Sequence, residues 1–233
     1  MSAHSAVLVF AKIPEPGRVK TRLLSMLSPQ RAADLHRACL QDTIATVSRV
    51  PGCRKSLRVA ARFDRALELA TALELNSRWR VGVQRGRDLG SRMRDGFECF
   101  FRSGFRKVLI VGTDTPWMGS ERILRAIWML NTSEVVLGPC TDGGYYLLGS
   151  RRLIPQLFQG IPWGTSQVLA RTIRALERAG AGYRLLPRDF DLDRPGDYQR
   201  AAQMLHRDAR RAPALARWIK DWELDRSLGP AFL

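Results

Sequence analysis

The sequence predicts an α/β protein of three layers, in which helices cover both faces of a mostly parallel sheet. One observation is the continuous apolar run AVLVFA at residues 6–11, which is typical of a strand buried on both faces of a parallel sheet. The other is the alternation of strand-like and helix-like segments along the chain. The 233 residues contain no linker rich in Gly, Ser or Pro and no internal repeat. We therefore expect one domain over residues 1–233, with residues 207–233 as a C-terminal helical extension.

The first helix has a clear start signal. Ser28 is a good N-cap residue, and Pro29 suits the first helical position. One face of this helix is predicted to carry Leu35, Cys39, Thr46 and Val50. Asp42 falls on that same face, where an apolar residue is expected. It either lies at the boundary and reaches water, or it anchors a basic loop.

The remaining elements follow from the same two periodicities. Short apolar runs predict strands at residues 57–61, 80–84, 107–111, 134–138, 145–148 and 183–186. Amphipathic spacing predicts helices at residues 64–75, 89–101, 120–130 and 166–179, a helix beginning near Pro195, and a last helix at residues 213–222.

The chain carries a net charge of +16, which suggests polyanions, acidic membrane surfaces or phosphorylated small molecules as partners. The surplus is scattered over nearly every predicted helix, whereas nucleic-acid-binding proteins concentrate it on one face. No apolar run approaches the ~18 residues of a membrane span, and the N-terminus does not resemble a signal peptide. We therefore expect a cytoplasmic protein that binds no membrane, with nucleic acid as a disfavoured partner.

The cysteines and histidines argue against several classes of metal site and catalytic mechanism. The four cysteines lie far apart without a CxxC pair, which argues against a zinc site and a disulfide framework. We expect them to be small buried residues in a reducing compartment. The three histidines include two in helical stretches near arginines, so Ser–His or Cys–His catalysis is not predicted.

In open α/β sheets, ligands bind beyond the carboxyl ends of the strands, and the loop after the first predicted strand is strongly basic. It carries Lys12, Arg18, Lys20 and Arg22 within eleven residues, and Gly17 permits a close backbone approach. The cations can converge on an anion, which predicts a phosphate-binding loop, although a solvated basic loop is the alternative. The loop matches neither the Walker A pattern nor GxGxxG.

Acidic residues follow later strands. Asp114 comes shortly after the strand at residues 107–111 and is well placed to carry Mg²⁺ together with substrate phosphates, or else to cap the next helix. Asp142 precedes Gly143 and Gly144 and has two tyrosines nearby for hydrogen bonding and stacking; a hairpin turn is the alternative.

A third acidic segment begins at Asp189. Alternation would place Asp189, Asp191 and Asp193 on one strand face, which is costly unless cationic groups meet them. Asp197, four residues further on, can act only at a helix N-terminus.

Taken together and in this order, six segments resemble one family. They are residues 12–23 (KIPEPGRVKTRL), 88–93 (DLGSRM), 112–116 (GTDTP), 138–148 (GPCTDGGYYLL), 161–168 (IPWGTSQV) and 191–198 (DLDRPGDY). The chain resembles the radical-SAM/selenodomain-associated transferases, a glycosyltransferase-A-like family within the nucleotide-diphospho-sugar transferase superfamily. The resemblance spans roughly residues 6–205.

The resemblance implies a glycosyltransferase-A-like fold that holds a nucleotide over the loop after the first strand. It implies that Asp114 is a metal-binding aspartate, that Asp193 is the second metal ligand, with Asp191 as the alternative, and that Lys20 contacts nucleotide phosphates. Within the matching segments, the further expected substrate- or nucleotide-binding residues are Lys12, Gly17, Arg18, Arg22, Asp88, Arg92, Gly143, Gly144, Tyr145 and Trp163.

Two positions depart from the family pattern. Arg194 stands where the family usually has Thr, so the following helix should lack its N-cap side chain. Arg87 stands where a small residue is expected, which changes the local substrate contact.

The leading functional hypothesis is a metal-dependent, glycosyltransferase-like enzyme that uses a nucleotide-activated donor and a small-molecule acceptor. Mg²⁺ or Mn²⁺ would neutralise the diphosphate leaving group, and the basic loop would add charge stabilisation. The catalytic residues would be Lys20, Asp114 and Asp142, the last as general base or orienting group on the acceptor side. The alternative is a nucleotidyltransferase that joins a nucleoside triphosphate to a phosphorylated small molecule. A non-catalytic nucleic-acid-binding protein is the third hypothesis.

Overall fold

The computed structural model describes residues 4–227 and contains a seven-stranded sheet in the order β3-β2-β1-β4-β6-β5-β7. All neighbouring strands are parallel except β6, which is antiparallel to both β4 and β5. The strands are β1 (Ser5–Ala11), β2 (Cys53–Val59), β3 (Trp79–Val83), β4 (Lys107–Val111), β5 (Val135–Pro139), β6 (Tyr145–Ser150) and β7 (Tyr183–Leu185).

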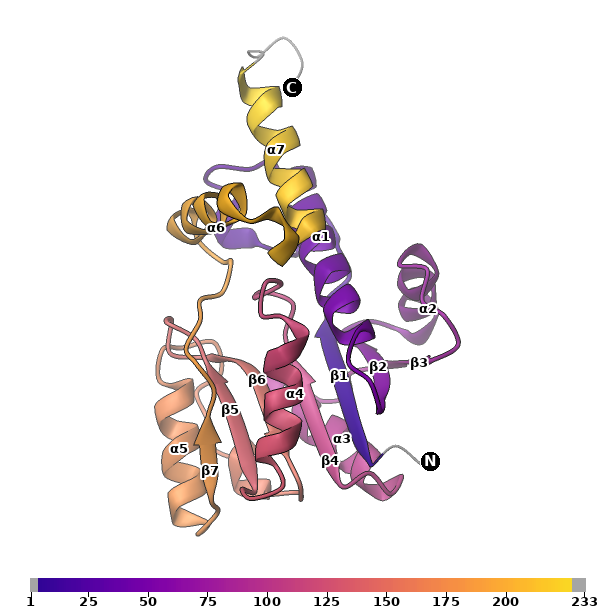
Figure 1. Cartoon of the computed structure of the whole chain (residues 1–233), viewed down its shortest axis with the longest axis vertical. Coiled ribbons are helices and arrows are strands. Elements are labelled where there is room, and N and C mark those ends of the chain that lie inside the picture. The colour runs from indigo at the N-terminus through magenta and orange to yellow at the C-terminus, as the bar shows by residue number, and fades with distance from the viewer. Residues whose placement is uncertain (1–3, 228–233) are drawn as a thin grey trace.

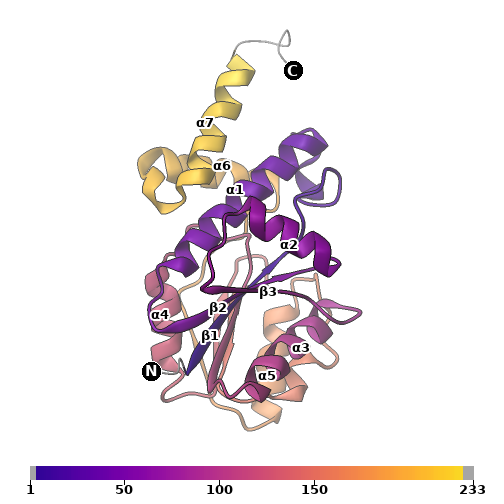
Figure 2. The same cartoon turned by 90° about the vertical axis from the view of Figure 1, so that its right-hand side faces the viewer.

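Helices cover both faces of this sheet (Figures 1 and 2). One apolar core joins the sheet to α1, α2 and α4, and a second joins its other face to α3 and α5. The helices are α1 (Pro29–Ser48), α2 (Phe63–Ala72), α3 (Leu89–Arg102), α4 (Ser120–Met129), α5 (Val168–Arg178), α6 (Pro195–Arg207) and α7 (Pro213–Ser227). This arrangement confirms the predicted three-layer, mostly parallel α/β fold.

The predicted elements are all present, with shifted ends. Ser28 caps α1 by accepting a hydrogen bond from the backbone N–H of Arg31, and Pro29 is the first helical residue, as predicted. Strand β2 begins at Cys53, four residues before the predicted start, because its polar first half pairs with β1 and is not recognisable from hydropathy. The helix predicted from residue 166 begins at Val168.

A third apolar cluster lies above the sheet, where α6 and α7 pack against the N-terminal half of α1. Figure 1 shows α7 running away from the sheet at the end of the chain. The helix is longer than the predicted residues 213–222, and residues 228–233 of the predicted extension lie outside the described residues.

Asp42 has neither of the two predicted roles. It is only 4% exposed, and its carboxylate accepts hydrogen bonds from the backbone N–H groups of Ala214 (2.9 Å) and Leu215 (2.8 Å). These are two of the free N–H groups in the first turn of α7. Burial raises the pKa of Asp42, partly offset by these two bonds. Asp42 therefore anchors the C-terminal helix to α1.

Replacing Asp42 with alanine should lower the free energy of unfolding by about 2 kcal/mol, because two buried N–H groups would lose their acceptor. Urea unfolding followed by circular dichroism measures the change. Asp34→Ala is the matched control, since Asp34 lies on the same helix and accepts only from Gln30. Equal losses in the two variants would contradict the anchoring role.

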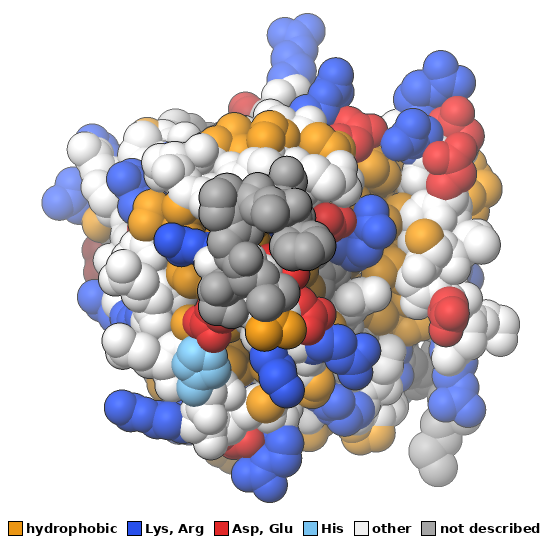
Figure 3. All heavy atoms as spheres, turned by 90° about the horizontal axis from the view of Figure 1, so that it is seen from above, with side chains coloured by type: hydrophobic (Ala, Val, Ile, Leu, Met, Phe, Trp, Pro, Cys, Tyr) orange, Lys and Arg blue, Asp and Glu red, His pale blue; other side chains and the backbone are white. Residues whose placement is uncertain are grey.

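The cysteines are only partly as predicted. Cys39 and Cys140 are buried, but Cys53 is half-buried and Cys99 is exposed on α3. In the described part of the chain, no helix is long and apolar enough to cross a bilayer. On the face shown in Figure 3, lysine and arginine side chains are spread among acidic and apolar ones.

Candidate nucleotide-binding site

A pocket of about 670 Å³ opens where β1 to β4 end. Its lining includes Ala11 at the end of β1, Ala60 after β2, Gln84 after β3 and Gly112 after β4. The carboxyl ends of four parallel strands thus meet at one edge, where ligands of open α/β sheets bind. The loop after β1, the β5–β6 hairpin and the segment before α6 complete the walls.

Lys20 is buried at the base of the pocket. Its side chain is 3% exposed, and its ammonium group donates to the carboxylate of Asp114 and to the carbonyl oxygen of Leu192. Burial acts to lower the pKa of Lys20, but the charge of Asp114, together with Cys39, the hydrogen bond to Asp114 and the charge of Asp193, outweighs it, so the pKa is raised. Lys20 also has a left-handed backbone (φ 50°), a conformation that is uncommon for residues other than glycine.

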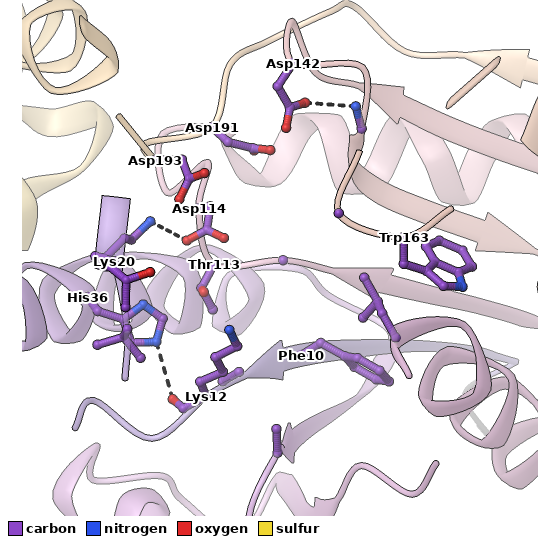
Figure 4. Close-up of a pocket in the computed structure, with 18 of the residues that line it drawn as sticks. Phe10, Lys12, Lys20, His36, Thr113, Asp114, Asp142, Trp163, Asp191 and Asp193 are labelled. Atoms are coloured by element: carbon purple, nitrogen blue, oxygen red, sulfur yellow. Dashed lines mark hydrogen bonds and ion pairs between the residues drawn. The ribbon is translucent and has the colours of Figure 1, made fainter. Parts of the chain in front are cut away.

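Asp114 projects further into the pocket than its partner, with 47% of its side chain exposed. Burial acts to raise its pKa, but the charge of Lys20, with its hydrogen bond, outweighs burial and lowers the pKa, so the carboxylate is held ionised. A buried ammonium therefore fixes one oxygen of Asp114 and leaves the rest of the carboxylate facing the ligand space (Figure 4).

The two arginines of the basic loop differ in freedom. Arg22 lies in the 3-10 helix η1 (Thr21–Leu23) and forms an ion pair with Asp193, across the pocket entrance. Arg18 is 81% exposed and lies 3.5 Å from Glu15. Arg18 can therefore swing toward a ligand, whereas Arg22 already has a partner.

A cluster of one buried thiol and two carboxylates, Cys140, Asp142 and Asp191, lies beside Asp114. The hydroxyl of Thr115 (2.7 Å) and the thiol of Cys140 (3.1 Å) both donate to Oδ1 of Asp191. Burial, followed by the charge of Asp114, raises the pKa of Asp191 to about 6. One ligand atom each from Cys140, Asp142 and Asp191 lies within 4.8 Å of the others, so these groups could hold a metal ion together.

Asp142 lies in the β5–β6 turn, as the hairpin alternative predicted. Its Oδ1 accepts from the backbone N–H of Gly144 (2.8 Å), and the residue is exposed at the pocket wall. The predicted tyrosine hydroxyls do not reach the pocket. Tyr146 donates to the carbonyl of Pro187 (3.0 Å), and the hydroxyl of Tyr145 is buried, so only the ring of Tyr145 contributes.

The acids at the third segment separate, contrary to the expectation of one shared face. Asp189 accepts from Trp117 (3.0 Å) and pairs with Arg122, outside the pocket. Asp191 and Asp193 both line it. Asp197 accepts from the backbone N–H of Arg194 (2.8 Å) at the start of α6, where Arg194 provides no side-chain cap, as predicted.

Sequence reasoning missed His36. This α1 residue is 4% exposed, lines the pocket and lies 3.3 Å from the carbonyl oxygen of Lys12 through Nε2. Burial lowers its pKa to about 4, with Asp114 raising it only in part. His36 is therefore neutral, donates from Nε2 and holds the start of the basic loop. The sequence pattern that could have indicated this role is a histidine on the predicted buried face of the first helix.

Most of the predicted binding residues line one pocket, namely Lys12, Arg18, Lys20, Arg22, Arg92, Asp114, Asp142, Gly144, Tyr145, Trp163 and Asp193. Three do not. Gly17 adopts φ 74° and shapes the loop from outside, and Asp88 caps α3 by accepting from the N–H of Ser91 (2.7 Å). Gly143 packs against the next loop, where a Cβ would lie 2.0 Å from the Ser166 carbonyl oxygen.

Solved structures with the same fold include two informative ones. A protein from Desulfovibrio desulfuricans G20, proposed to be a nucleotide-diphospho-sugar transferase, is 29% identical with a TM-score of 0.88 over 95% of this chain and 96% of that one. A cytidylyltransferase from Leptospira borgpetersenii serovar Hardjo-bovis is 11% identical with a TM-score of 0.58, covering 97% and 96%. The first likeness confirms the glycosyltransferase-A-like fold, and the second shows the fold alone.

A comparison with curated proteins finds no match. A family model described as "Uncharacterized protein conserved in bacteria (DUF2064)" matches residues 43–165, which is more than half of the chain. That region contains α3, β4 and the β5–β6 hairpin, and with them Asp114 and Asp142. The chain therefore belongs to the DUF2064 family.

Proposed function

We propose that this protein is a metal-dependent transferase that uses a nucleotide-activated donor and transfers a glycosyl group to a small-molecule acceptor. The observation that carries the proposal is a single pocket in which a basic loop after the first strand faces acids from three other segments. The likeness to a protein proposed to be a nucleotide-diphospho-sugar transferase supports the donor class. The resemblance to the radical-SAM/selenodomain-associated transferases supports a nucleotide held over the loop after β1.

The basic loop is proposed to bind the donor diphosphate. Lys12, Arg18 and Arg22 line the pocket from one side, and Lys20 adds a fixed positive charge at its base. Hydrogen bonds from such cations to phosphate oxygens are stronger than neutral ones, especially away from bulk water. The loop thereby stabilises the negative charge that develops on the departing diphosphate.

The acids fit a hard divalent cation. Asp114, Asp191 and Asp193 present carboxylates to one pocket, and the repulsion between Asp114 and Asp191 is not fully neutralised by Lys20. Oxygen ligands from one or two carboxylates plus substrate phosphates suit Mg²⁺ or Mn²⁺. We propose that Asp114 and Asp193 hold the ion, with Asp191 beside them. A bound ion would supply charge neutralisation on the diphosphate.

Asp142 is proposed to serve the acceptor. It lies on the wall opposite the basic loop, and its bond to the Gly144 N–H occupies only one carboxylate oxygen. The other oxygen can accept the proton of an acceptor hydroxyl or orient that hydroxyl for attack.

A second candidate, nucleotidyl transfer to a phosphorylated small molecule, is favoured by the number of cations in the basic loop, since that chemistry depends on positioning and charge. The shared fold with a cytidylyltransferase is compatible with it. Nucleic-acid binding is disfavoured by the spread of positive side chains in Figure 3.

Lys20→Ala should weaken the binding of nucleoside diphosphates about ten- to a hundredfold and leave that of the bare nucleosides nearly unchanged. Removing the ammonium leaves the Asp114 and Asp191 charges uncompensated at the base of the pocket, and they repel phosphate. Isothermal titration calorimetry measures the affinity of Lys20→Ala for both kinds of ligand and compares it with that of the parent protein. Lys220→Ala, at the surface of α7, is the control. Equal losses for nucleoside and diphosphate would mean that the loop is deformed, and the phosphate assignment would fail.

A further inference from the structure

The two ends of the pocket differ in chemistry. The end formed by the loop after β1 and by α1 contributes Lys12, Arg18, Lys20, Arg22 and His36. The hairpin turn and the loop that carries Trp163 contribute Asp142, Gly144, Tyr145, Trp163, Gly164, Thr165 and Val168, with no lysine or arginine, and the neighbouring first turn of α3 contributes Leu89 and Arg92. In Figure 4, Trp163 lies at the opposite end of the pocket from Lys20 and His36.

Trp163 is held in place by close packing on two sides. Its ring lies against the first turn of α3, where a Cβ on Gly90 would come within 2.4 Å of Nε1 and 2.6 Å of Cε2. Behind it, the loop of residues 161–168 rests on Gly143, whose carbonyl oxygen accepts from the N–H of Leu169 (2.8 Å). A half-exposed tryptophan with this support is a rigid flat wall of the pocket.

The neighbouring wall is also apolar. Phe10 and Leu89 line the pocket beside Trp163, and Leu89 keeps 44% of its surface exposed although it is the first residue of α3. Arg92 is the cation of the pocket lining that lies outside the basic loop. Its Nε donates to the carbonyl oxygen of Gly86 (3.1 Å), in the loop before α3. A phosphate placed beside Trp163 and Asp142 would therefore meet the carboxylate of Asp142, and the Nε of Arg92 is already bonded to the protein.

From this division we infer that the end of the pocket around Trp163 is the acceptor subsite, and that it takes an uncharged, ring-shaped hydroxyl compound such as a glycoside. This inference rests on the proposed transferase function and names its acceptor class. The C–H face of such a ring is slightly positive and packs on the electron-rich face of an indole. Its hydroxyl then lies toward Asp142, an exposed carboxylate in the hairpin turn whose Gly143 packs against the loop that carries Trp163.

The test uses saturation-transfer NMR with neutral methyl glycosides and the matching sugar 6-phosphates, with nucleoside diphosphates and Mg²⁺ titrated separately. Trp163→Leu keeps an apolar side chain but removes the flat face, and Trp163→Phe restores a flat ring. Trp128→Ala is the control, because Trp128 is 65% exposed on α4 and outside the pocket. We expect glycoside affinity to fall about tenfold in Trp163→Leu and to stay within a few-fold in Trp163→Phe and Trp128→Ala.

Three results would overturn the inference: no methyl glycoside binds the parent protein, Trp163→Leu binds as tightly as the parent, or sugar 6-phosphates bind more tightly than neutral glycosides. The last result would also favour nucleotidyl transfer. Nucleoside diphosphate affinity should be unchanged in Trp128→Ala. Failure of the parent protein to bind any nucleoside diphosphate would instead count against the proposed function, so the two failures are distinguishable.

Discussion

Asp142→Asn is expected to lower turnover about 10²- to 10⁴-fold, the usual contribution of a general base. The substitution removes the proton acceptor but keeps the carbonyl oxygen that accepts from the Gly144 N–H, so the hairpin turn is preserved. The effect should appear in kcat, because an acceptor hydroxyl must lose its proton as it attacks, while the Michaelis constant for the donor should change little.

The measurement is steady-state kinetics with a substrate pair found by nucleotide and glycoside screening, and Asp95→Asn, an acid outside this pocket, is the control. Turnover within a few-fold of the parent would remove Asp142 as a base. It would favour nucleotidyl transfer, in which an ionised phosphate attacks and no proton has to leave.

Asp114→Asn should abolish the part of nucleotide affinity that depends on a divalent metal, a loss of roughly a hundredfold or more at saturating metal. An amide is a much weaker ligand than a carboxylate for a hard cation. The fold should survive, because the amide oxygen can still accept from Lys20 and 47% of the Asp114 side chain is exposed.

Calorimetric titration of a nucleoside diphosphate with and without Mn²⁺ measures this effect, with Asp221→Asn on the surface of α7 as the control. If Asp114→Asn and the parent protein show the same gain on adding Mn²⁺, Asp114 is not a ligand of the ion.

The layered fold and the position of the pocket were predictable because they depend on local signals. The AVLVFA run, the Ser28–Pro29 helix start and the short loops after apolar runs each act within a few residues. The carboxyl ends of parallel strands then meet at one edge whatever the details of packing.

Contacts between distant segments were not predictable in this way. Asp42 caps a helix that begins 171 residues later, and nothing in the sequence around it names that partner. Lys20 was expected to reach for phosphate directly, whereas the structure buries it against Asp114 and Leu192. The support that Gly90 gives Trp163 arises only when α3 and the 161–168 loop meet.

The same limit applies to chemistry that depends on burial. His36 belongs to none of the six family-like segments, and its place at the site follows from which face α1 buries. The raised pKa of Asp191, about 6, is caused by burial and by the nearness of Asp114, neither of which can be taken from residue spacing.

We propose above that this pocket binds a nucleotide-activated donor together with a divalent cation. Thermal unfolding tests this binding with a panel of nucleoside triphosphates, nucleoside diphosphates and nucleotide sugars, each with and without Mn²⁺. A ligand present at about 100 times its dissociation constant stabilises the folded state by about 2.7 kcal/mol. For a domain of this size that raises Tm by roughly 5–11 °C. We predict such a rise for at least one base series of diphosphate-containing ligands, larger with Mn²⁺ than without it. A flat panel, in which no nucleotide raises Tm with or without Mn²⁺, would contradict the claim.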